Sequence, residues 1–533
     1  MASAAPLVQP AVATAAPAPA TPTGSNLTRR ASLNAAQALL DYSARLVVGL
    51  VTMPILVRLL GQSLFGTWQV LGQLLGYLTS TDGRPTDALR LVVANRAAVD
   101  DPATMRRHVG SALVVWLLFL PLAAVAGGVL VWLAPTLTKV SPALVPVVRI
   151  AAALLVLQFL LATLSAVPEA VLRGANLGYK RMGLQSGLQI LGGILAVGAV
   201  TLGLGLVGLS LAQVALATVT ALCFWLLARR YVPWFGVAKP QRVDVRGMVR
   251  TSVWLALGDL IAKLLVASDV VILGAVLSPA AATPYVLTGY ASRTAMGILV
   301  LATMGAMPGL GSVIGQGHKE RAAALRAELL WLTWLAATVL GVAMLVWNRS
   351  FVRLWVGSEQ YAGLVPNVLL VVATVQTAFI RCDSYIIDAA LRPRLRVLVG
   401  AIAAITTIGA CIVMTREFGL VGLCYGVVLG RLVQTVMYPI IAARSIAAGS
   451  IGATGWLATA RPIVAMMLLF AAAAYVGERN PTNGWPLWAA GVVLTTVAAV
   501  VLAYGLGLPA DVRRVTLNRV RSALGLGDGV AHV

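Results

Sequence analysis

Two pairs of oppositely charged residues lie inside long apolar stretches of this sequence, where they could bind a ligand or a proton. Asp41 and Arg45 are four residues apart, and so are Asp259 and Lys263. This spacing places both members of a pair on one face of a helix. Each pair either neutralises itself and fixes its helix, or it lines a polar cavity and contacts a substrate or a proton.

Three arginines in similar surroundings, Arg293, Arg381 and Arg431, have no obvious partner in the sequence. Asp383 is only two residues from Arg381 and would point elsewhere on a helix. A guanidinium group forms bidentate hydrogen bonds with phosphate or carboxylate, so an unpaired arginine in a cavity favours an anionic ligand. The alternative is an arginine near a helix end that extends to the membrane surface. Asp269 fits either a proton or cation site or a polar contact between helices.

Other kinds of chemistry have no matching residue pattern. The four cysteines and three histidines show neither a CxxC nor a Cys/His spacing, which argues against a zinc site or a cysteine nucleophile. The sequence contains no GxxxxGK[ST] phosphate-binding loop. No connection between apolar stretches exceeds roughly 25 residues, which leaves little room for a soluble catalytic domain. We therefore expect neither an enzyme nor a cofactor.

Membrane helices are the elements that must position these residues. Of the 533 residues, 59% are hydrophobic and only 11% are charged, whereas soluble proteins carry roughly 25% charged residues. A soluble core this apolar would have too little polar surface to cover it. Runs of about 20 apolar residues predict an all-α polytopic membrane protein with about fourteen spans, near 33–60, 66–82, 109–134, 147–172, 182–202, 206–228, 250–277, 283–312, 328–348, 363–390, 395–414, 418–443, 456–476 and 485–508.

The basic residues predict the orientation of these spans. The formal net charge is +22, but the basic residues are scattered between apolar runs rather than clustered, so nucleic acid is not an expected partner. With a cytoplasmic N-terminus, the cytoplasmic connections hold about 27 of the 40 basic residues and the opposite side about seven. The positive-inside rule therefore favours cytoplasmic N- and C-termini.

The chain also repeats itself at a nearly constant offset. Four sets of residues recur in the same order: Glu169-Ala-Val-Leu-Arg173 as Asp388-Ala-Ala-Leu-Arg392, Gly205-Leu-Val-Gly-Leu209 as Gly419-Leu-Val-Gly-Leu423, Asp41 and Arg45 as Asp259 and Lys263, and Leu60, Trp68 and Gly72 as Leu277, Tyr285 and Gly289. We predict two six-helix repeats. Because six is an even number of spans, the repeats are parallel and are related by an axis along the membrane normal.

These observations predict an organisation in six parts. They are a flexible Ala/Pro-rich tail (1–28), an N-terminal six-helix bundle (29–235), a cytoplasmic linker (236–245), a C-terminal six-helix bundle (246–446), two additional helices (447–509) and a basic cytoplasmic tail (510–533).

Short motifs in the first spans resemble a known family. The run Pro54-Ile-Leu-Val-Arg-Leu-Leu-Gly61, then Phe65-Gly66, Gly76-Tyr77 and Asp82-Gly83, is similar to the opening of bacterial polysaccharide-unit flippases. These flippases belong to the multidrug/oligosaccharidyl-lipid/polysaccharide exporter superfamily. The resemblance covers roughly residues 30–445. It departs from the family pattern at Arg84, where an apolar residue more often follows the glycine.

The resemblance implies a fold and a function. Such proteins have twelve or fourteen helices in two bundles around a central cavity, and they move a polyprenyl-diphosphate-linked oligosaccharide from the inner to the outer leaflet by alternating access. The product is a surface polysaccharide such as O-antigen lipopolysaccharide, or an exopolysaccharide. A flippase for the peptidoglycan lipid precursor and a cation-coupled drug antiporter of the same superfamily remain alternatives. The short external loops count against a polysaccharide polymerase or ligase.

The resemblance also implies roles for the charged residues and for the surroundings of the protein. Residues expected to meet the diphosphate or acidic sugars are Arg45, Lys263, Arg293, Arg381 and Arg431, and those expected to pair or to couple transport to an ion are Asp41, Asp259, Asp269 and Asp383. The expected energy source, if there is one, is a proton or sodium gradient. The expected location is the bacterial inner membrane, with membrane lipids and a polysaccharide polymerase or other assembly proteins as partners.

Overall fold

A computed structural model describes most of the chain as helices. The described residues are 24–96, 101–177, 183–297, 299, 313–314, 316–390, 393–446, 454–508 and 513. Most of the predicted N-terminal tail, nearly all of the C-terminal tail and most of the second half of the predicted span 283–312 lie outside them. The predicted tail boundary at residue 28 falls inside the first helix, which begins at Gly24.

The first half of the chain forms the N-terminal bundle. Its helices are α1 (Gly24–Leu78), α2 (Pro85–Arg96), α3 (Pro102–Leu137), α4 (Val145–Gly174), α5 (Leu184–Thr201) and α6 (Gly205–Tyr231). All but α2 coincide with predicted spans. The short helix α2 lies in a predicted connection, and its polar and charged residues make it less apolar than the helices around it.

The second half forms the C-terminal bundle and two further helices. The C-terminal bundle contains α7 (Arg242–Ile272, continued by the π turn Leu273–Leu277), α8 (Pro279–Thr288), α10 (Lys319–Val356), α11 (Leu364–Ala389), α12 (Pro393–Gly430) and α13 (Leu432–Ser445); the added pair is α14 (Thr454–Arg479) and α15 (Trp485–Leu502). Residues 290–297 are also helical.

Two glycines interrupt α1 and α12, each of which extends over more than one predicted span. Gly61 interrupts α1 with φ 75° and ψ 169°, and Gly419 interrupts α12 with φ 59° and ψ −138°. Both conformations lie in the left-handed half of φ space that glycine tolerates best. Gly61 therefore marks the turn between the first two predicted spans, and Gly419 lies at the start of the predicted span 418–443.

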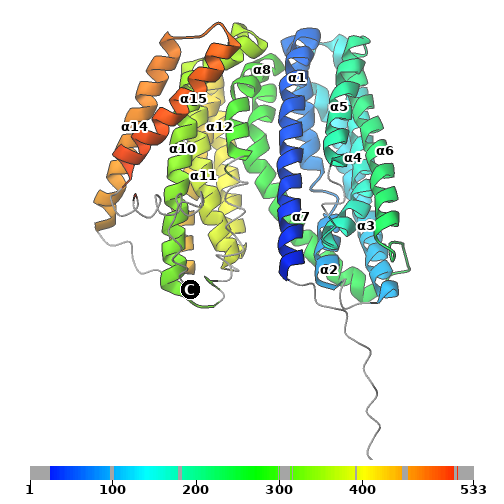
Figure 1. Cartoon of the computed structure of the whole chain (residues 1–533). Coiled ribbons are helices and arrows are strands. Elements are labelled where there is room, and N and C mark those ends of the chain that lie inside the picture. Colours follow the sequence, from blue (N-terminus) through cyan, green and yellow to red (C-terminus); the bar gives the residue numbers. More distant parts are fainter. Residues whose placement is uncertain are drawn as a thin grey trace, which may run out of the picture.

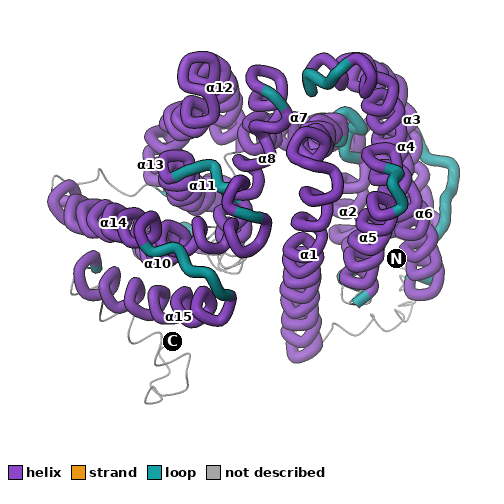
Figure 2. Tube along the Cα trace, turned by 90° about the horizontal axis from the view of Figure 1, so that it is seen from above, coloured by secondary structure: helices purple, strands orange, loops and turns teal. Residues whose placement is uncertain are grey.

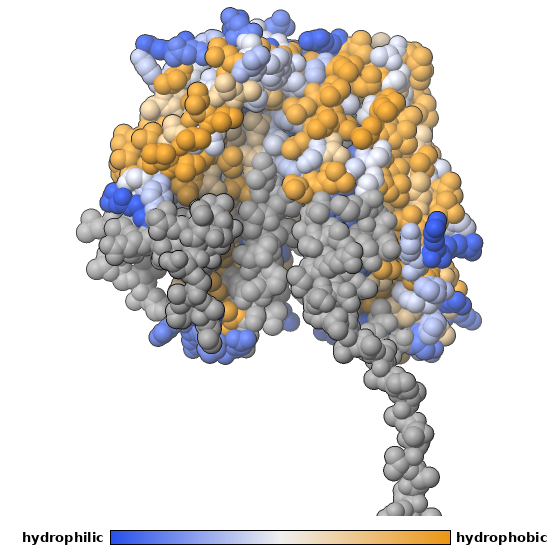
Figure 3. All heavy atoms as spheres, in the orientation of Figure 1, coloured by the Kyte–Doolittle hydropathy of each residue, from blue (hydrophilic) through white to orange (hydrophobic). Residues whose placement is uncertain are grey.

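The helices are long and apolar enough to cross a bilayer. Within the described residues ten helices meet this test, and eleven do if the bent α7 segment is one span. Helices broken at Gly61 and Gly419 are counted once each in these totals, which accounts for part of the difference from fourteen. Figure 3 shows an apolar band between two polar ends of the molecule. The chain is a multi-pass all-α membrane protein.

The two bundles stand side by side, with α7 at their junction (Figure 2). Helices α14 and α15 flank α10 on the outer side of the C-terminal bundle (Figure 1). In the same view α2, the start of α3 and the start of α10 lie at the lower end of the molecule. These segments belong to two of the predicted cytoplasmic connections, which therefore lie at the same end of the molecule.

Close packing holds the bundles together at the opposite end. A Cβ atom on Gly66 would lie 1.8 Å from the carbonyl oxygen of Pro279, so only glycine permits this approach of α1 to α8. The indole N–H of Trp355 donates to the carbonyl of Leu50 at 2.7 Å, and Thr283 donates to the carbonyl of Gln62 at 2.8 Å. Both of these hydrogen bonds use backbone carbonyls as acceptors.

Candidate anion-binding cavity

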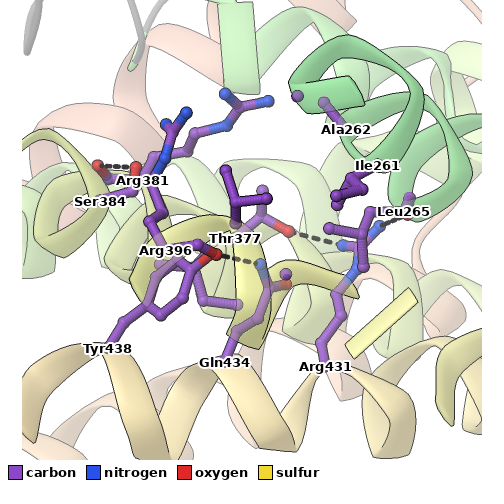
Figure 4. A pocket seen from close by; sticks show the side chains of 14 residues that line it. Ile261, Ala262, Leu265, Thr377, Arg381, Ser384, Arg396, Arg431, Gln434 and Tyr438 are labelled. Atoms are coloured by element: carbon purple, nitrogen blue, oxygen red, sulfur yellow. Dashed lines mark hydrogen bonds between the residues drawn. The ribbon is translucent and has the colours of Figure 1, made fainter. Parts of the chain in front are cut away.

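A cavity of about 100 Å³ lies inside the C-terminal bundle between α7, α11, α12 and α13. We call it the arginine cavity, because its lining includes Arg381, Arg396 and Arg431 (Figure 4). None of the described residues that line it is acidic. Two of the five predicted cationic residues, Arg381 and Arg431, are thus brought together, and Arg396 joins them.

Arg431 lies where α12 ends and α13 begins. Its guanidinium donates to the hydroxyl of Thr377 at 2.5 Å and to the carbonyls of Ala373 at 3.3 Å and Leu265 at 3.4 Å. The bonds to Thr377 and Leu265 are drawn in Figure 4. All three acceptors are uncharged, so the side chain is held in place while its positive charge stays available to a ligand.

Arg381 is the most available cation of the cavity. In the described part of the chain its guanidinium makes neither a hydrogen bond nor an ion pair, while its carbonyl accepts the Ser384 hydroxyl at 2.9 Å. A partly buried guanidinium has five N–H donors to satisfy. An anionic oxygen in the cavity would satisfy them.

Asp383 points away from the cavity, as its spacing from Arg381 predicted. It is buried and receives the Nε and a terminal nitrogen of Arg326 from α10 at 3.0 and 2.8 Å. Arg326 also donates to the carbonyl of Pro439 at 3.4 Å. This contact ties α10 to α11 and α13, so Asp383 is committed to an interhelical ion pair.

Arg396 differs from the other two arginines because it has a carboxylate partner. Its guanidinium lies 2.8 Å from Asp388, and its carbonyl accepts the Tyr438 hydroxyl at 3.2 Å. Tyr438 in turn accepts an N–H of Gln434 at 3.1 Å. The cavity therefore holds two positive charges, on Arg381 and Arg431, that no carboxylate within ion-pair distance neutralises among the described residues.

Asp259 and Lys263 form the predicted pair, at 2.6 Å, but on the other face of α7. Asp259 also accepts the Ser80 hydroxyl at 2.7 Å and lies 3.2 Å from Arg84. Lys263 donates to the hydroxyl of Thr79. We call these five residues the junction cluster, because they join the α1–α2 connection of one bundle to α7 of the other.

Asp269 and Arg293 lie outside the arginine cavity. Asp269 accepts the Tyr285 hydroxyl at 2.5 Å and the backbone N–H of Val270 at 2.8 Å. Arg293 donates to the carbonyl of Val286. Asp269 is close enough to interact electrostatically with both Arg293 and Arg431, so it acts as a distant counter-charge behind the cavity.

Asp41 and Arg45 do not form an ion pair, although both belong to the described residues. Asp41 accepts hydrogen bonds from Gln37 at 3.3 Å and from the hydroxyl of Ser186 at 3.0 Å. Arg45 is exposed on α1. The same i,i+4 spacing therefore gives an ion pair on α7 and none on α1, because a neighbouring helix offers Asp41 a neutral donor.

Three residues of these sites were missed in the sequence. Arg84, Arg326 and Arg396 lie in or near predicted cytoplasmic connections, where the positive-inside rule alone accounts for a basic residue. Their partners are 175, 57 and 8 positions away, as Asp259, Asp383 and Asp388 respectively. Only the short separation of Arg396 from Asp388 was a usable signal.

Comparisons with known proteins agree with this architecture. A family model described as "Polysaccharide biosynthesis protein" matches residues 35–313. A search of curated proteins found no match. Among solved structures, the lipid II flippase MurJ in an inward closed conformation is similar, with a TM-score of 0.63 and 10% identity over 88% of this chain and 97% of that one.

A second kind of transporter has the same fold. The inward-facing conformation of a multidrug resistance MATE family transporter of the MOP superfamily has a TM-score of 0.61 and 15% identity, over 78% of this chain and 99% of that one. Its outward-facing counterpart has a TM-score of 0.55 and 15% identity, over 81% and 99%. At these identities the similarity establishes the fold.

Proposed function

The chain belongs to the polysaccharide biosynthesis protein family, and on that premise we propose that it is a flippase for a polyprenyl-diphosphate-linked oligosaccharide. It would carry the sugar head group from the cytoplasmic to the outer leaflet of the bacterial inner membrane. The family match and the fold shared with MOP-superfamily transporters support a flippase or exporter. The site supports the class of substrate.

The charge of the arginine cavity is the observation that carries this proposal. Within the described part of the chain, the guanidinium of Arg381 has no hydrogen-bond partner, and that of Arg431 is held only by uncharged acceptors. Because guanidinium groups bind phosphate oxygens through paired, charge-assisted hydrogen bonds, a diphosphate is a matching ligand. An organic cation would meet like charge there, which disfavours a drug antiporter.

Transport requires shelter for the sugar while the lipid tail remains in the bilayer. Sugar hydroxyls that enter hydrocarbon lose their hydrogen bonds to water, at a cost of roughly 4–8 kcal/mol each. Rocking of the two bundles would move the head group between the two sides of the membrane. The junction cluster would have to open in this motion, because it joins the bundles at their basic end.

The remaining parts of the proposal concern energy and partners. We propose that transport is driven by a proton or sodium gradient or by removal of the product outside, and that a polysaccharide polymerase consumes the product. The peptidoglycan lipid precursor carries the same diphosphate, so the arginine cavity suits it equally. Substrate competition between the two lipids separates these functions.

Reconstitution tests the proposal directly. Proteoliposomes holding the full chain and a fluorescent polyprenyl-diphosphate oligosaccharide should expose the sugar on the opposite leaflet at a rate that depends on the protein. Hydrogen bonds to charged groups contribute about 1.5–3 kcal/mol, so Arg381→Ala should slow flipping by about tenfold or more. Arg416→Ala is the matched control, because Arg416 is an exposed arginine on α12 that does not line the cavity.

Two results would contradict the proposal. One is flipping at the same rate in protein-free vesicles and proteoliposomes. The other is an equal loss of activity in Arg381→Ala and Arg416→Ala. That result would show that removing any arginine impairs the protein and that the cavity arginine has no specific role in transport.

A further inference from the structure

A second cavity, of about 270 Å³, lies within the N-terminal bundle between the end of α1, α2 and α4. We call it the Asp82 cavity. Its charged lining has three acidic and three basic side chains: Asp82, Asp87, Glu169, Arg84, Arg90 and Arg173. The formal charge of this lining is balanced, whereas the arginine cavity is purely cationic.

Four of the six charged residues are already paired. Arg84 lies 2.5 Å from Asp87, and Arg173 lies 2.7 Å from Glu169. Asp82, only 7% exposed, accepts the backbone N–H of Arg84 at 2.8 Å. No cationic side chain within the described residues forms an ion pair with Asp82, and the guanidinium of Arg90 makes no bond in that part of the chain. Asp82 also interacts with the side chain of Thr163. The guanidinium donors of Arg90, and the acceptor sites of Asp82 that Arg84 and Thr163 leave open, thus remain for a ligand.

A carboxylate and a guanidinium group in the same cavity are suited to bind uncharged hydroxyl groups. A hydroxyl donates one hydrogen bond and accepts two, so one sugar ring can donate to a carboxylate and accept from a guanidinium. Because the charged lining has no net charge, it offers no overall attraction to a diphosphate or to an organic cation. The Asp82 cavity therefore favours an uncharged polyhydroxylated ligand.

The position of the Asp82 cavity relates it to the arginine cavity. Arg84 lines the Asp82 cavity and contacts Asp259 on α7, while the adjacent residue Gly258 lines the arginine cavity. One face of α7 therefore lines the arginine cavity, and its other face contacts Arg84, a lining residue of the Asp82 cavity. Opening of the junction cluster would remove this contact between Arg84 and α7.

We propose that the Asp82 cavity is a carbohydrate-binding subsite that recognises a sugar next to the diphosphate, with Asp82 and Arg90 as its recognition groups. This inference rests on the proposed function, since it presumes a lipid-linked sugar. Arg90 donates to a sugar hydroxyl, and Asp82 accepts from one. The arginine cavity supplies affinity for the diphosphate, and the Asp82 cavity supplies preference for a glycosylated lipid.

Binding of matched lipids to the full chain in nanodiscs separates the two roles. The probes are polyprenyl diphosphate and the same lipid carrying one glucose, galactose or N-acetylglucosamine. We expect the wild type to bind at least one glycosylated probe about tenfold more tightly than the sugar-free probe. Arg90→Ala and Asp82→Asn should reduce this ratio to about one while leaving the affinity for the sugar-free probe unchanged.

Control variants keep the test decisive. Arg230→Ala, at an exposed position on α6, should keep the wild-type ratio, and Arg90→Gln serves if Arg90→Ala does not fold. A wild type without preference for any glycosylated probe would overturn the inference, as would a preference that survives both Asp82→Asn and Arg90→Ala, or an equal loss of affinity for both probe types in these variants.

Arg381→Ala tests the proposed function separately. It should weaken binding of the sugar-free and glycosylated probes by the same factor. If it weakens neither, the diphosphate assignment of the arginine cavity fails, whereas the ratio measured with the Arg90 and Asp82 variants still reports on the Asp82 cavity.

Discussion

The two halves of the chain carry matching sequence motifs but differ in where they place charge. The offset that aligns Glu169 with Asp388 places Ala162 opposite Arg381. Likewise, the offset that aligns Gly205 with Gly419 places Ala217 opposite Arg431. The C-terminal half therefore has guanidinium groups where the N-terminal half has methyl groups.

The charged pairs on α1 and α7 differ in the same sense. Asp259 holds Lys263 and Arg84 across the bundle interface, whereas Asp41 is bonded to Gln37 and Ser186 within its own half. The matching sequences of the two halves thus have a different distribution of charged contacts. Under the proposed function, this difference predicts that the C-terminal bundle alone holds the anionic part of the substrate.

Replacing an arginine that only the C-terminal half carries should have the largest effect on the flipping rate. Arg431→Ala removes a charge that is held only by neutral groups, and we expect flipping of the lipid-linked probe to fall by about tenfold or more. Arg431→Lys keeps the charge but loses the forked geometry, so it should retain an intermediate rate. Full activity of both variants at normal protein level would show that Arg431 does not contact the substrate.

The junction cluster is expected to show the next largest effect. Asp259→Arg places three positive charges together with Arg84 and Lys263, which should open the bundles at their basic end and reduce flipping severalfold. Adding Arg84→Asp restores an opposite-charge contact and should recover part of the rate. Spin labels at Arg230 and Arg394, one in each bundle, would measure the separation in a background without native cysteines. Unchanged distances in Asp259→Arg would contradict a joining role.

Replacing Asp41 on α1 should reduce flipping less than replacing Asp259 on α7. Asp41→Asn keeps a group that can accept from Ser186, so we expect flipping to change by less than about twofold. Asp259→Asn loses two ionic contacts and should be more harmful. Side-by-side flipping assays of these two variants measure the asymmetry, and equal losses would refute it.

The positions of the helices were more predictable from the sequence than the partners of the charged residues. Long apolar runs fix the spans because about 20 apolar residues are needed to cross a bilayer, and Gly61 and Gly419 interrupt α1 and α12 near boundaries between predicted spans. The ion pair of Asp259 and Lys263 was predictable because its partners are one helical turn apart. Asp41 has the same spacing from Arg45, yet a serine on α5 takes its carboxylate.

Tertiary partners could not be inferred from local spacing. Asp383 meets Arg326 from a different helix, and Arg84 meets Asp259 from the other bundle. Both arginines lie close to connections where positive charge is already expected. Long-range pairing of this kind depends on helix packing, which one sequence without related sequences does not specify.

The smallest expected effect is on thermal stability. Replacing Asp82 and Asp101, two aspartates of the N-terminal bundle, should change the melting temperature in opposite directions. Burial raises the pKa of the Asp82 carboxyl, although hydrogen bonds and the charges of Arg84 and Lys263 oppose it. The folded protein therefore binds this proton more tightly than the unfolded chain, and stability is lost as the pH rises through the raised pKa. Asp82→Asn removes that loss, so its melting temperature should exceed that of the wild type at neutral pH and converge with it in acid.

Asp101 is the opposite case, because hydrogen bonding to Thr104 lowers its pKa. Asp101→Asn should be slightly less stable than the wild type at neutral pH, with the difference again lost in acid. Thermal unfolding in detergent across this pH range measures both, and a constant offset at every pH for Asp82→Asn would exclude titration of Asp82 as the cause.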